Sequence, residues 1–395
     1  MAAPCKAIQK DPDLVYEYTN KWNTVAVISD CTRILGLGDI GPEAGLLAME
    51  GKALLFKYLG GVDAFPLTLD AKDPARFIDI VKALQPALGG VNLEDIAQPK
   101  RFGILDQLRQ EMRIPIWHDD QQGAAAVTLA GLINALKIVG KPLGEIRLVM
   151  VGAGAAGLAT YRVLRAAGLK PEQVVLVDEH GILGSWMSEL EGENPTLFTS
   201  LQGTNPERLH GGIGDAMRGV DVVIAYSKPG PDTIAPAWIG RMSMDPILFT
   251  CANPIPEIWP WDAHEGGARI VATGRSDFPN QVNNSLGFPG IFRGALDVRS
   301  RAISDEMCIA AAEDLAASAE RSGLREDRLI PTMDDWTVFV EETVAVGMKA
   351  VEQGLPRLQL SEEELRGQAQ RIIRRARRET EVLAREGLVP LSPAE

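Results

Sequence analysis

Cysteine is scarce in this chain, and the few cysteines present are far apart. No two of them have the CxxC spacing of a redox pair or of a thiolate zinc site. A disulfide framework and a cysteine-ligated zinc centre are therefore not expected. We interpret all four as reduced thiols, at Cys5, Cys31, Cys251 and Cys308.

Long apolar runs are also missing. No stretch approaches the ~20 uncharged apolar residues of a membrane span, and the N-terminal "MAAPCKAIQKDPD" has no apolar core of a signal peptide. We therefore expect no membrane partner and a cytoplasmic location.

An excess of positive charge is the third absence, because the formal net charge is −13. Nucleic-acid binding draws most of its affinity from neutralising phosphates, so nucleic acid is not an expected partner. The one basic run, "RIIRRARRE" at 371–379, lies in a helical pattern that Ser361 and Glu364 open as a capping box. We interpret it as a solvated helix face or a subunit contact.

What the chain has is enough apolar sequence for two domains, since 46% of its residues are hydrophobic. Apolar patterning predicts the first set of elements. These are strands over 24–29, 64–70 and 114–117, helices over 43–59, 104–113 and 124–139, and a polar turn at 118–123.

Strands and helices then alternate, which indicates a parallel, doubly wound sheet of the Rossmann type. The expected strands cover 147–151, 173–178, 220–227, 246–254 and 269–274. The fold class is thus α/β with two domains. We predict an N-terminal α/β domain over 1–124, a nucleotide domain over 125–300, and C-terminal helices over 301–395 that pack on the nucleotide domain.

The run "VGAGAAG" is the predicted dinucleotide site. It follows a strand directly and opens a helix, so backbone N–H groups and the helix N-terminus can receive a pyrophosphate. Asp178 ends the next strand, where a carboxylate binds ribose hydroxyls and repels a 2′-phosphate, so NAD is favoured and NADP is the alternative. The expected cofactor-binding residues are Gly152, Ala153, Gly154, Ala155, Ala156, Gly157 and Asp178.

An earlier glycine run, at Gly36, Gly38 and Gly41 of "CTRILGLGDIGPEAG", fails the same test. Asp39 and Glu43 would repel a pyrophosphate, so these glycines instead favour close backbone packing near a site. By residue type alone, Arg33 and Lys52 on either side would be a surface charge and a snorkelling helix residue.

Two acidic pairs stand at the ends of apolar segments: Glu94 with Asp95, and Asp119 with Asp120. Carboxylates of this kind bind hard cations such as Mg²⁺ or Mn²⁺. Adjacent acids are also common on surfaces, so spacing alone leaves both interpretations open. His118 is interpreted as a core residue or one that supports the ligands.

Seven segments, in order along the chain, resemble the malic enzymes, specifically their short bacterial form. They are "ILGLGDIGPEAGLLAMEGKALLFK", "VNLEDI", "IPIWHDDQQGAAAVTLAGLINALK", "VGAGAAG", "ANPIPEI", "ATGRSDFPNQVNN" and "FPGIFRGALD". The resemblance runs from about residue 5 to about residue 320. It implies oxidation of L-malate with NAD(P)⁺, decarboxylation of the resulting oxaloacetate, and release of pyruvate and CO₂.

The same resemblance implies roles for single residues. Lys52 would be the general base for the C2 hydroxyl, with a pKa lowered by a nearby cation, and Asp119 would belong to its catalytic network. Arg33 would clamp a substrate carboxylate. Substrate would also contact Asn284, for which Asn283 is the alternative, and Asn253, which would border the cofactor too. The divalent ion would be bound by Glu94, Asp95 and Asp120, so the resemblance makes residues 1–124 the substrate and metal domain.

Some features depart from the family pattern. Its catalytic tyrosine, in an "AYTPGVA"-like segment, would come just before Ala3, and whether the native protein has sequence upstream of Met1 stays open; Tyr16 and Tyr18 are interpreted as structural. Two alternatives stay open: the same chemistry on a malate analogue with another anionic group, and a catalytically impaired, NAD-binding regulatory protein. A homodimer or higher homo-oligomer is expected.

Overall fold

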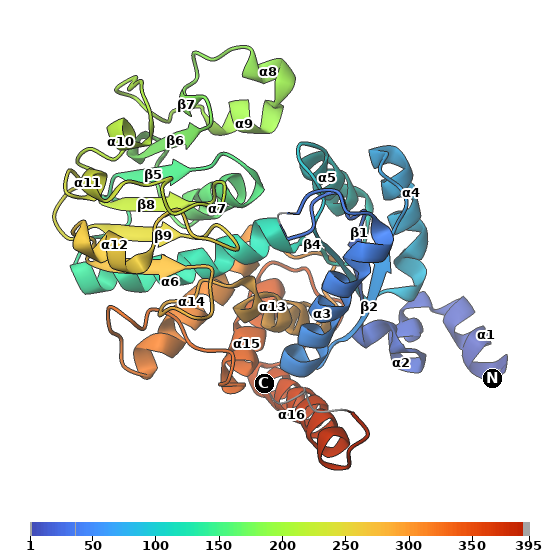
Figure 1. The fold of residues 1–395 in the computed structure, drawn as a ribbon. Helices are drawn as coiled ribbons and strands as arrows, with labels where there is room; N and C mark the ends of the chain where they lie inside the picture. The colour runs from blue at the N-terminus through green and yellow to red at the C-terminus, as the bar shows by residue number, and fades with distance from the viewer. Residues whose placement is uncertain (1, 36, 390–395) are drawn as a thin grey trace.

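The computed structural model describes residues 2–35 and 37–389, which form two lobes, each built around a sheet (Figure 1). The first sheet is parallel with the order β2-β1-β3-β4. Its strands are β1 (Thr24–Ser29), β2 (Asp63–Thr68), β3 (Gly90–Leu93) and β4 (Ile116–His118). The predicted strands in this region are confirmed, and β3 joins them in the centre of the sheet.

Helices cover both faces of this sheet because β1 is apolar on both. Val25 and Val27 face a cluster shared with α3 (Pro42–Gly60) and α13 (Phe288–Asp297). Ala26 and Ile28 face the opposite cluster, with α4 (Pro74–Leu84) and α5 (Lys100–Glu111). Short helical pieces precede the sheet: α1 (Ala2–Lys10), η1 (Pro12–Leu14), α2 (Val15–Tyr18) and η2 (Asn20–Asn23). Another, η3 (Gln85–Ala87), precedes β3.

The second sheet has the order β10-β9-β8-β5-β6-β7. All its pairs are parallel except β6 with β7, which sequence patterning did not predict. This is the doubly wound arrangement predicted from the alternating pattern. The strands are β5 (Leu148–Val151), β6 (Val174–Asp178), β7 (Gly181–Ile182), β8 (Val222–Ala225), β9 (Ile247–Thr250) and β10 (Ile270–Thr273).

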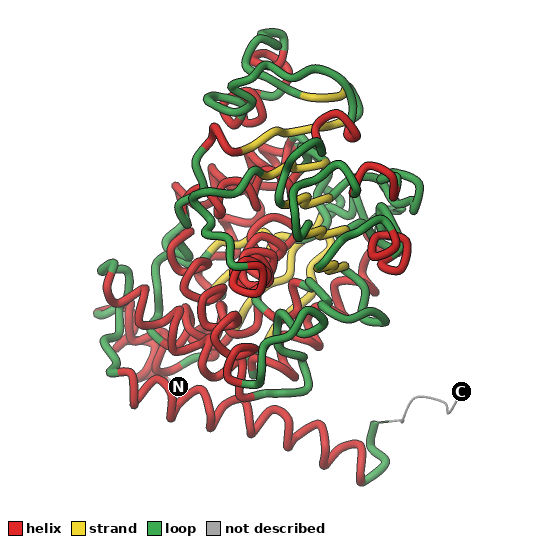
Figure 2. The backbone as a smooth tube through the Cα atoms, turned by 90° about the vertical axis from the view of Figure 1, so that its left-hand side faces the viewer, coloured by secondary structure: helices red, strands yellow, loops and turns green. Residues whose placement is uncertain are grey.

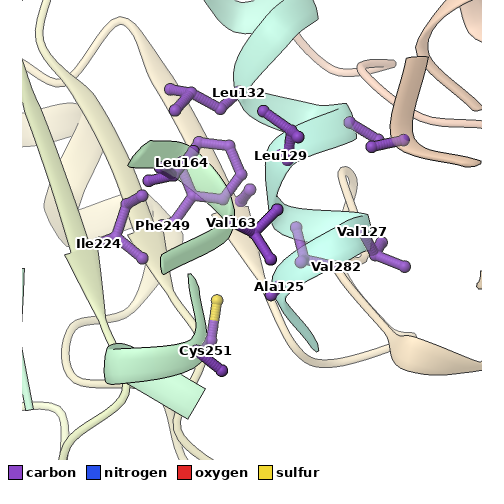
Figure 3. Packing of buried hydrophobic residues seen from close by; sticks show 14 of the residues in the cluster. Ala125, Val127, Leu129, Leu132, Val163, Leu164, Ile224, Phe249, Cys251 and Val282 are labelled. Atoms are coloured by element: carbon purple, nitrogen blue, oxygen red, sulfur yellow. The ribbon is translucent and has the colours of Figure 1, made fainter. Parts of the chain in front are cut away.

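Two apolar clusters sandwich the second sheet. On one face, α6 (Ala124–Val139) and α7 (Ala155–Ala166) pack on the strands, with Leu129 and Leu132 lying near Phe249 and Leu164 (Figure 3). The other face is covered by α10 (Ile213–Ala216), α11 (Pro236–Ile239) and α12 (Pro260–Glu265). Shorter elements complete the lobe: η5 (Pro171–Gln173), α8 (Leu190–Glu193), α9 (Pro195–Ser200) and η6 (Asn284–Leu286).

By length and composition alone, the segment Asp119–Val139 could cross a membrane, but 72% of its most apolar 18-residue stretch is buried inside the protein. It is a core helix joining the two lobes. Its first turn, η4 (Asp119–Gly123), is π-helical rather than the predicted polar turn. Such turns often occur at functional sites.

The C-terminal helices α14 (Asp305–Arg321), α15 (Thr337–Glu352) and α16 (Glu362–Arg385) pack on both lobes. Helix α14 contacts α6 and α7, whereas α16 contacts α3 and extends along the bottom of the molecule (Figure 2). The predicted packing on the nucleotide domain alone is therefore incomplete. The capping box of Ser361 and Glu364 is confirmed, with the Ser361 N–H donating to Oε2 of Glu364 at 2.9 Å.

Candidate active site

Lys52 of α3 lies between two carboxylates from different elements. Its Nζ is 2.5 Å from Oδ2 of Asp119 in the π-helical turn and 3.3 Å from Oε1 of Glu94 after β3. All three side chains are largely buried. The ring of Phe288, at the start of α13, lies 4.5 Å from the same Nζ. The ammonium group is thus fixed on one side by charge and on the other by an aromatic face.

Strand periodicity orients the two carboxylates. Asn92 and Glu94 are two residues apart, so they share a face, and Asn92 Nδ2 donates to Glu94 Oε2 at 2.8 Å. Trp117 stands in the same relation to Asp119, and its Nε1 donates to Asp119 Oδ1 at 3.0 Å. Each carboxylate therefore has one oxygen held by a strand neighbour and the other free to face Lys52.

Burial and mutual repulsion dominate the electrostatics. Burial, together with the neighbouring carboxylates, raises the pKa of Glu94 well above its ordinary value, and burial raises the pKa of Asp119. Burial lowers the pKa of Lys52, but Asp119 and Glu94 outweigh it and the net pKa is raised. Among the protein groups the two carboxylates favour the charged ammonium, and the lowering expected from a nearby cation stays a prediction.

Asp95 and Asp120, the chain neighbours of Glu94 and Asp119, also lie together. Burial and the charge of Asp120 raise the pKa of Asp95 to about 7. The Asp95 N–H donates to Asp120 Oδ2 at 3.0 Å, and the Arg33 N–H donates to the Asp95 carbonyl oxygen at 3.2 Å. The backbone at Arg33 is therefore tied to the acidic pair, while the Arg33 side chain is exposed.

The donor set fits a hard divalent cation, because carboxylates that raise one another's pKa are compensated by positive charge. Within residues 2–35 and 37–389, however, no three His, Cys, Asp or Glu side chains converge closely enough to form a ligand cluster. Glu94 is bonded to Lys52 and Asn92 instead. The metal assignment of Glu94, Asp95 and Asp120 remains a prediction.

The turn between β5 and α7 has the shape expected of a pyrophosphate site. Gly152 has φ +99°, and a Cβ there would lie 2.4 Å from the Tyr226 carbonyl oxygen. A Cβ on Gly157 would lie 2.0 Å from the Gly152 carbonyl oxygen. Gly154 is the N-cap of α7. Only glycine allows the backbone to approach this closely, which leaves the helix N-terminus open to an anion.

Asp178 ends β6, as predicted, and one of its oxygens accepts the His180 N–H at 2.8 Å. Burial raises its pKa. Ala153, Ala155 and Ala156 complete the turn and the first residues of α7. Gln98, from the first lobe, borders the turn, since a Cβ on Gly154 would lie 3.5 Å from its Oε1.

The two predicted substrate asparagines lie in different surroundings. A Cβ on Gly123 would lie 2.0 Å from Asp119 Oδ1 and 3.0 Å from Asn284 Cβ, so Asn284 lies beside the π-helical turn. Asn283 instead caps η6, where its Oδ1 accepts the Ser285 N–H at 2.9 Å. Asn253 is exposed on the loop after β9, and no hydrogen bond joins it to the Lys52 cluster.

The earlier glycine run lies beside the site without forming a phosphate cradle. Gly36 is outside the described residues. Gly41 is the N-cap of α3, the helix that carries Lys52, and Asp39 pairs with Lys72 at 2.6 Å. The run therefore sets the start of α3, and it has an acid, Asp39, two residues before the N-cap of that helix.

Patterning missed several residues around the carboxylates. Asn92 and Trp117 could have been predicted, because each lies two residues before an acid. Phe288 is far in the sequence from Lys52, as Gln98 is from the glycine turn, so no local pattern indicates these contacts. Arg101, on α5, is buried, and its Nε and Nη1 have no hydrogen-bond partner among the residues that the structure describes; burial lowers its pKa to about 10. His118 is fully buried with its pKa lowered to about 4 by burial, as befits a neutral core residue.

Comparison with protein families gives two matches that together cover most of the chain. The malic enzyme N-terminal domain matches residues 1–109. The malic enzyme NAD binding domain matches residues 121–258 and 266–353. The second match begins at residue 121, within the π-helical turn where the two lobes join.

Individual relatives agree with these matches. A NAD-dependent malic enzyme from Geobacillus stearothermophilus is 48% identical over 357 residues, covering 90% of this chain and 73% of its own. A bifunctional malic/malolactic enzyme from Bacillus subtilis is 47% identical, covering 92% and 88%. The crystal structure of malic enzyme from Pyrococcus horikoshii is 54% identical with a TM-score of 0.92, covering 94% and 86%.

Proposed function

The chain belongs to the malic enzyme family, and from that premise we propose how its own residues carry out the reaction. It is an NAD(P)-dependent enzyme that decarboxylates malate oxidatively, giving pyruvate and CO₂. The contact of Lys52 with Asp119 and Glu94 carries the residue-level proposal. This contact supports a site in which a base, a proton acceptor and buried negative charge act together.

Lys52 is the general base for the C2 hydroxyl. Because its neighbours hold it protonated, it must first release a proton, and Asp119 Oδ2 is 2.5 Å away to receive it. Burial raises the pKa of Asp119, which favours that transfer. Asp119 thus serves in the catalytic network by storing the proton of Lys52.

Glu94, Asp95 and Asp120 would hold Mg²⁺ or Mn²⁺. The bound ion supplies electrostatic stabilisation for negative charge that develops on the substrate oxygens. Arg33 clamps a substrate carboxylate, since its backbone is tied to Asp95 and its side chain is free to reach outward. Asn284, beside Asp119, contacts the substrate on the other side.

The glycine turn over 152–157 would bind the dinucleotide pyrophosphate, and the bound nicotinamide would supply the acceptor for a hydride from C2. Asn253 borders substrate and cofactor from the loop after β9. Asp178 binds the ribose hydroxyls and favours NAD⁺, although both NAD- and NADP-dependent enzymes are among the relatives.

A homodimer or higher homo-oligomer fits the surface around α3. Four large apolar side chains are exposed on that helix and on the loop before it: Leu35, Leu37, Leu47 and Leu54. Exposed apolar patches of this kind mark protein interfaces. No nucleic acid or membrane is proposed as a partner, and the four free cysteines fit a cytoplasmic location.

The test is an assay of the purified chain with L-malate, NAD⁺ and Mn²⁺, in which NADH and pyruvate are both quantified. Equal amounts of the two support malate decarboxylation. Activity on an analogue with another anionic group but not on malate would favour the alternative substrate. NAD⁺ binding without turnover of either would favour the regulatory alternative.

A further inference from the structure

In the loop after β9, both chain neighbours of Asn253 are held by side chains: Ala252 by Glu257 of the same loop, and Pro254 by Arg275 of the loop after β10. On the inner side, Glu257 is fully buried, and its Oε2 accepts the Ala252 N–H at 3.1 Å. Its Oε1 accepts the Ser227 N–H at 2.8 Å and the Ser227 hydroxyl at 3.1 Å. One carboxylate therefore joins the loop after β8 to the residue just before Asn253.

On the outer side, Arg275 holds the residue just after Asn253. Its Nη1 donates to the Pro254 carbonyl oxygen at 2.5 Å. The rest of the guanidinium is fixed by two bonds to Asp277, at 2.8 and 2.6 Å. It also lies 5.9 Å from the Trp259 ring and 5.7 Å from the Phe278 ring. The donor to Pro254 is thus rigid even though it is at the surface.

These contacts connect Asn253 to the rest of the nucleotide lobe. A Cβ on Gly274 would lie 3.1 Å from Asn253 Nδ2, so the Asn253 side chain rests against the start of the Arg275 loop. The loop held through Ser227 also contains Tyr226, whose carbonyl oxygen is next to Gly152 in the dinucleotide turn. The position of Asn253 is therefore set relative to that turn.

We propose that Glu257 and Arg275 are positioning residues that clamp the backbone on both sides of Asn253 and so aim its amide at the reacting substrate. The proposal rests on the proposed function of Asn253. A carboxylate is needed at 257 because two N–H groups must be accepted by different oxygens. Glutamine would turn an NH₂ group toward one of them and leave that amide unpaired.

The test compares Glu257→Gln and Arg275→Gln with the wild type for malate kcat and KM, and for the Kd of NAD⁺. Each variant should lower kcat/KM for malate by about 10- to 100-fold, the scale of a misplaced contact in an active site. For Arg275→Gln the NAD⁺ Kd should stay within about threefold, because Arg275 holds Pro254 and its loss leaves the pyrophosphate turn intact. Arg275→Lys, which keeps a donor for Pro254, should recover part of the loss.

Matched controls separate positioning from general damage. Arg325 makes the same two-residue Arg–Asp pair with Asp327 on the surface, so Arg325→Gln should leave kinetics unchanged. Glu342 is as buried as Glu257 but has no partner on either oxygen within the described residues, and Glu342→Gln should also leave them unchanged. Equal losses in the controls would overturn the proposal.

The decisive measurement repeats the clamp variants in an Asn253→Ala background. If Glu257→Gln and Arg275→Gln act through Asn253, adding either of them to Asn253→Ala should not lower kcat/KM below the value for Asn253→Ala alone. Additive losses would contradict the proposal. Hydrogen exchange of the Ala252 amide gives a readout independent of malate: Glu257→Gln should accelerate it at least about tenfold. Unchanged exchange refutes the clamp, whereas a wild type inactive on malate refutes only the proposed function.

Discussion

The buried carboxylates around Lys52 show how single residues acquire properties that their type does not give them. An isolated lysine is protonated at neutral pH and so cannot accept a proton, and the two carboxylates beside Lys52 raise its pKa further. The same neighbours have raised pKa values themselves, so a proton can move within the cluster rather than to water. The cluster therefore has to be treated as a unit that shares protons.

Asp120→Asn tests the metal assignment at the scale of one ligand. A neutral amide is a weaker ligand for a hard cation than a carboxylate, so the Kd for Mn²⁺ should rise at least about tenfold. Electron paramagnetic resonance of free Mn²⁺ measures this without substrate or turnover. Asp106→Asn, at an exposed position of α5, is the control. An unchanged Mn²⁺ Kd would remove Asp120 from the ligand set.

Asp178 makes a prediction about cofactor choice. One of its oxygens is occupied by the His180 N–H, and the carboxylate still opposes a 2′-phosphate. The kcat/KM for NAD⁺ should exceed that for NADP⁺ by at least about tenfold, and Asp178→Ala should narrow the gap. Wild-type values that are equal, or higher for NADP⁺, would show that other groups accept the phosphate.

Among the elements, the turn from β5 into α7 depends most strictly on residue size. A Cβ on Gly157 meets a backbone oxygen at 2.0 Å, which cannot move aside as a flexible side chain would. Gly157→Ala should therefore raise the Kd of NAD⁺ by at least about tenfold by distorting the turn. Gly103→Ala is the control, because a Cβ there meets nothing within 4 Å. Normal NAD⁺ binding by Gly157→Ala would contradict the assigned turn.

Elements with strong local signals could be predicted from the sequence. The run at 24–29 is the observed β1, and the helix expected over 43–59 is found at Pro42–Gly60. The glycine turn was recognisable because strand, glycines and helix follow one another directly. These features depend on interactions between near neighbours in the chain.

Features that depend on the path of the chain could not be predicted in the same way. Lys52 and Asp119 are 67 residues apart, and only the resemblance to a family placed them in one site. The sequence predicts a polar turn at 118–123, and the structure has a π-helical turn there, in which Gly123 fits closely against Asp119 and Asn284. The direction of the Lys52 pKa likewise depends on which charges the fold brings near.

At the scale of the whole molecule, the C-terminal third completes the first lobe as well as the second. Helix α13 supplies Phe288 and Phe292 to the cluster beneath the first sheet. Arg293 on the same helix forms a buried ion pair with Asp297 at 2.7 Å and also donates to Asn23. Helices α14 and α15 contribute residues both to this cluster and to the cluster beside the second sheet, so they join the two lobes.

The burial of Glu342 makes the stability of the protein depend on pH. It is fully buried on α15, and burial raises its pKa well above the ordinary value. The folded state then binds a proton at Glu342 more tightly than the unfolded state does. The contribution of Glu342 to the free energy of unfolding is therefore largest at low pH and falls as pH rises above about 4.3. The loss reaches at most about 1.4 kcal/mol per pH unit until the folded pKa is passed.

Glu342→Gln removes that loss, since the amide is neutral at every pH. Its free energy of unfolding relative to wild type should be more favourable at pH 8 than at pH 5, as measured by urea denaturation. Glu313→Gln, an exposed acid on α14, should show no such trend. A difference that is the same at both pH values would mean that Glu342 titrates normally.

The central claim, that Lys52 is the base for malate oxidation in this fold, is tested most directly by Lys52→Ala. NADH and pyruvate formation are measured at saturating L-malate, NAD⁺ and Mn²⁺, together with the Kd of NAD⁺. Lys57→Ala serves as the control, since Lys57 is on the same helix and pairs with Asp63 and Glu379. We predict that Lys52→Ala loses both products by about 10²- to 10⁴-fold with an unchanged NAD⁺ Kd. Wild-type rates from that variant would contradict the account.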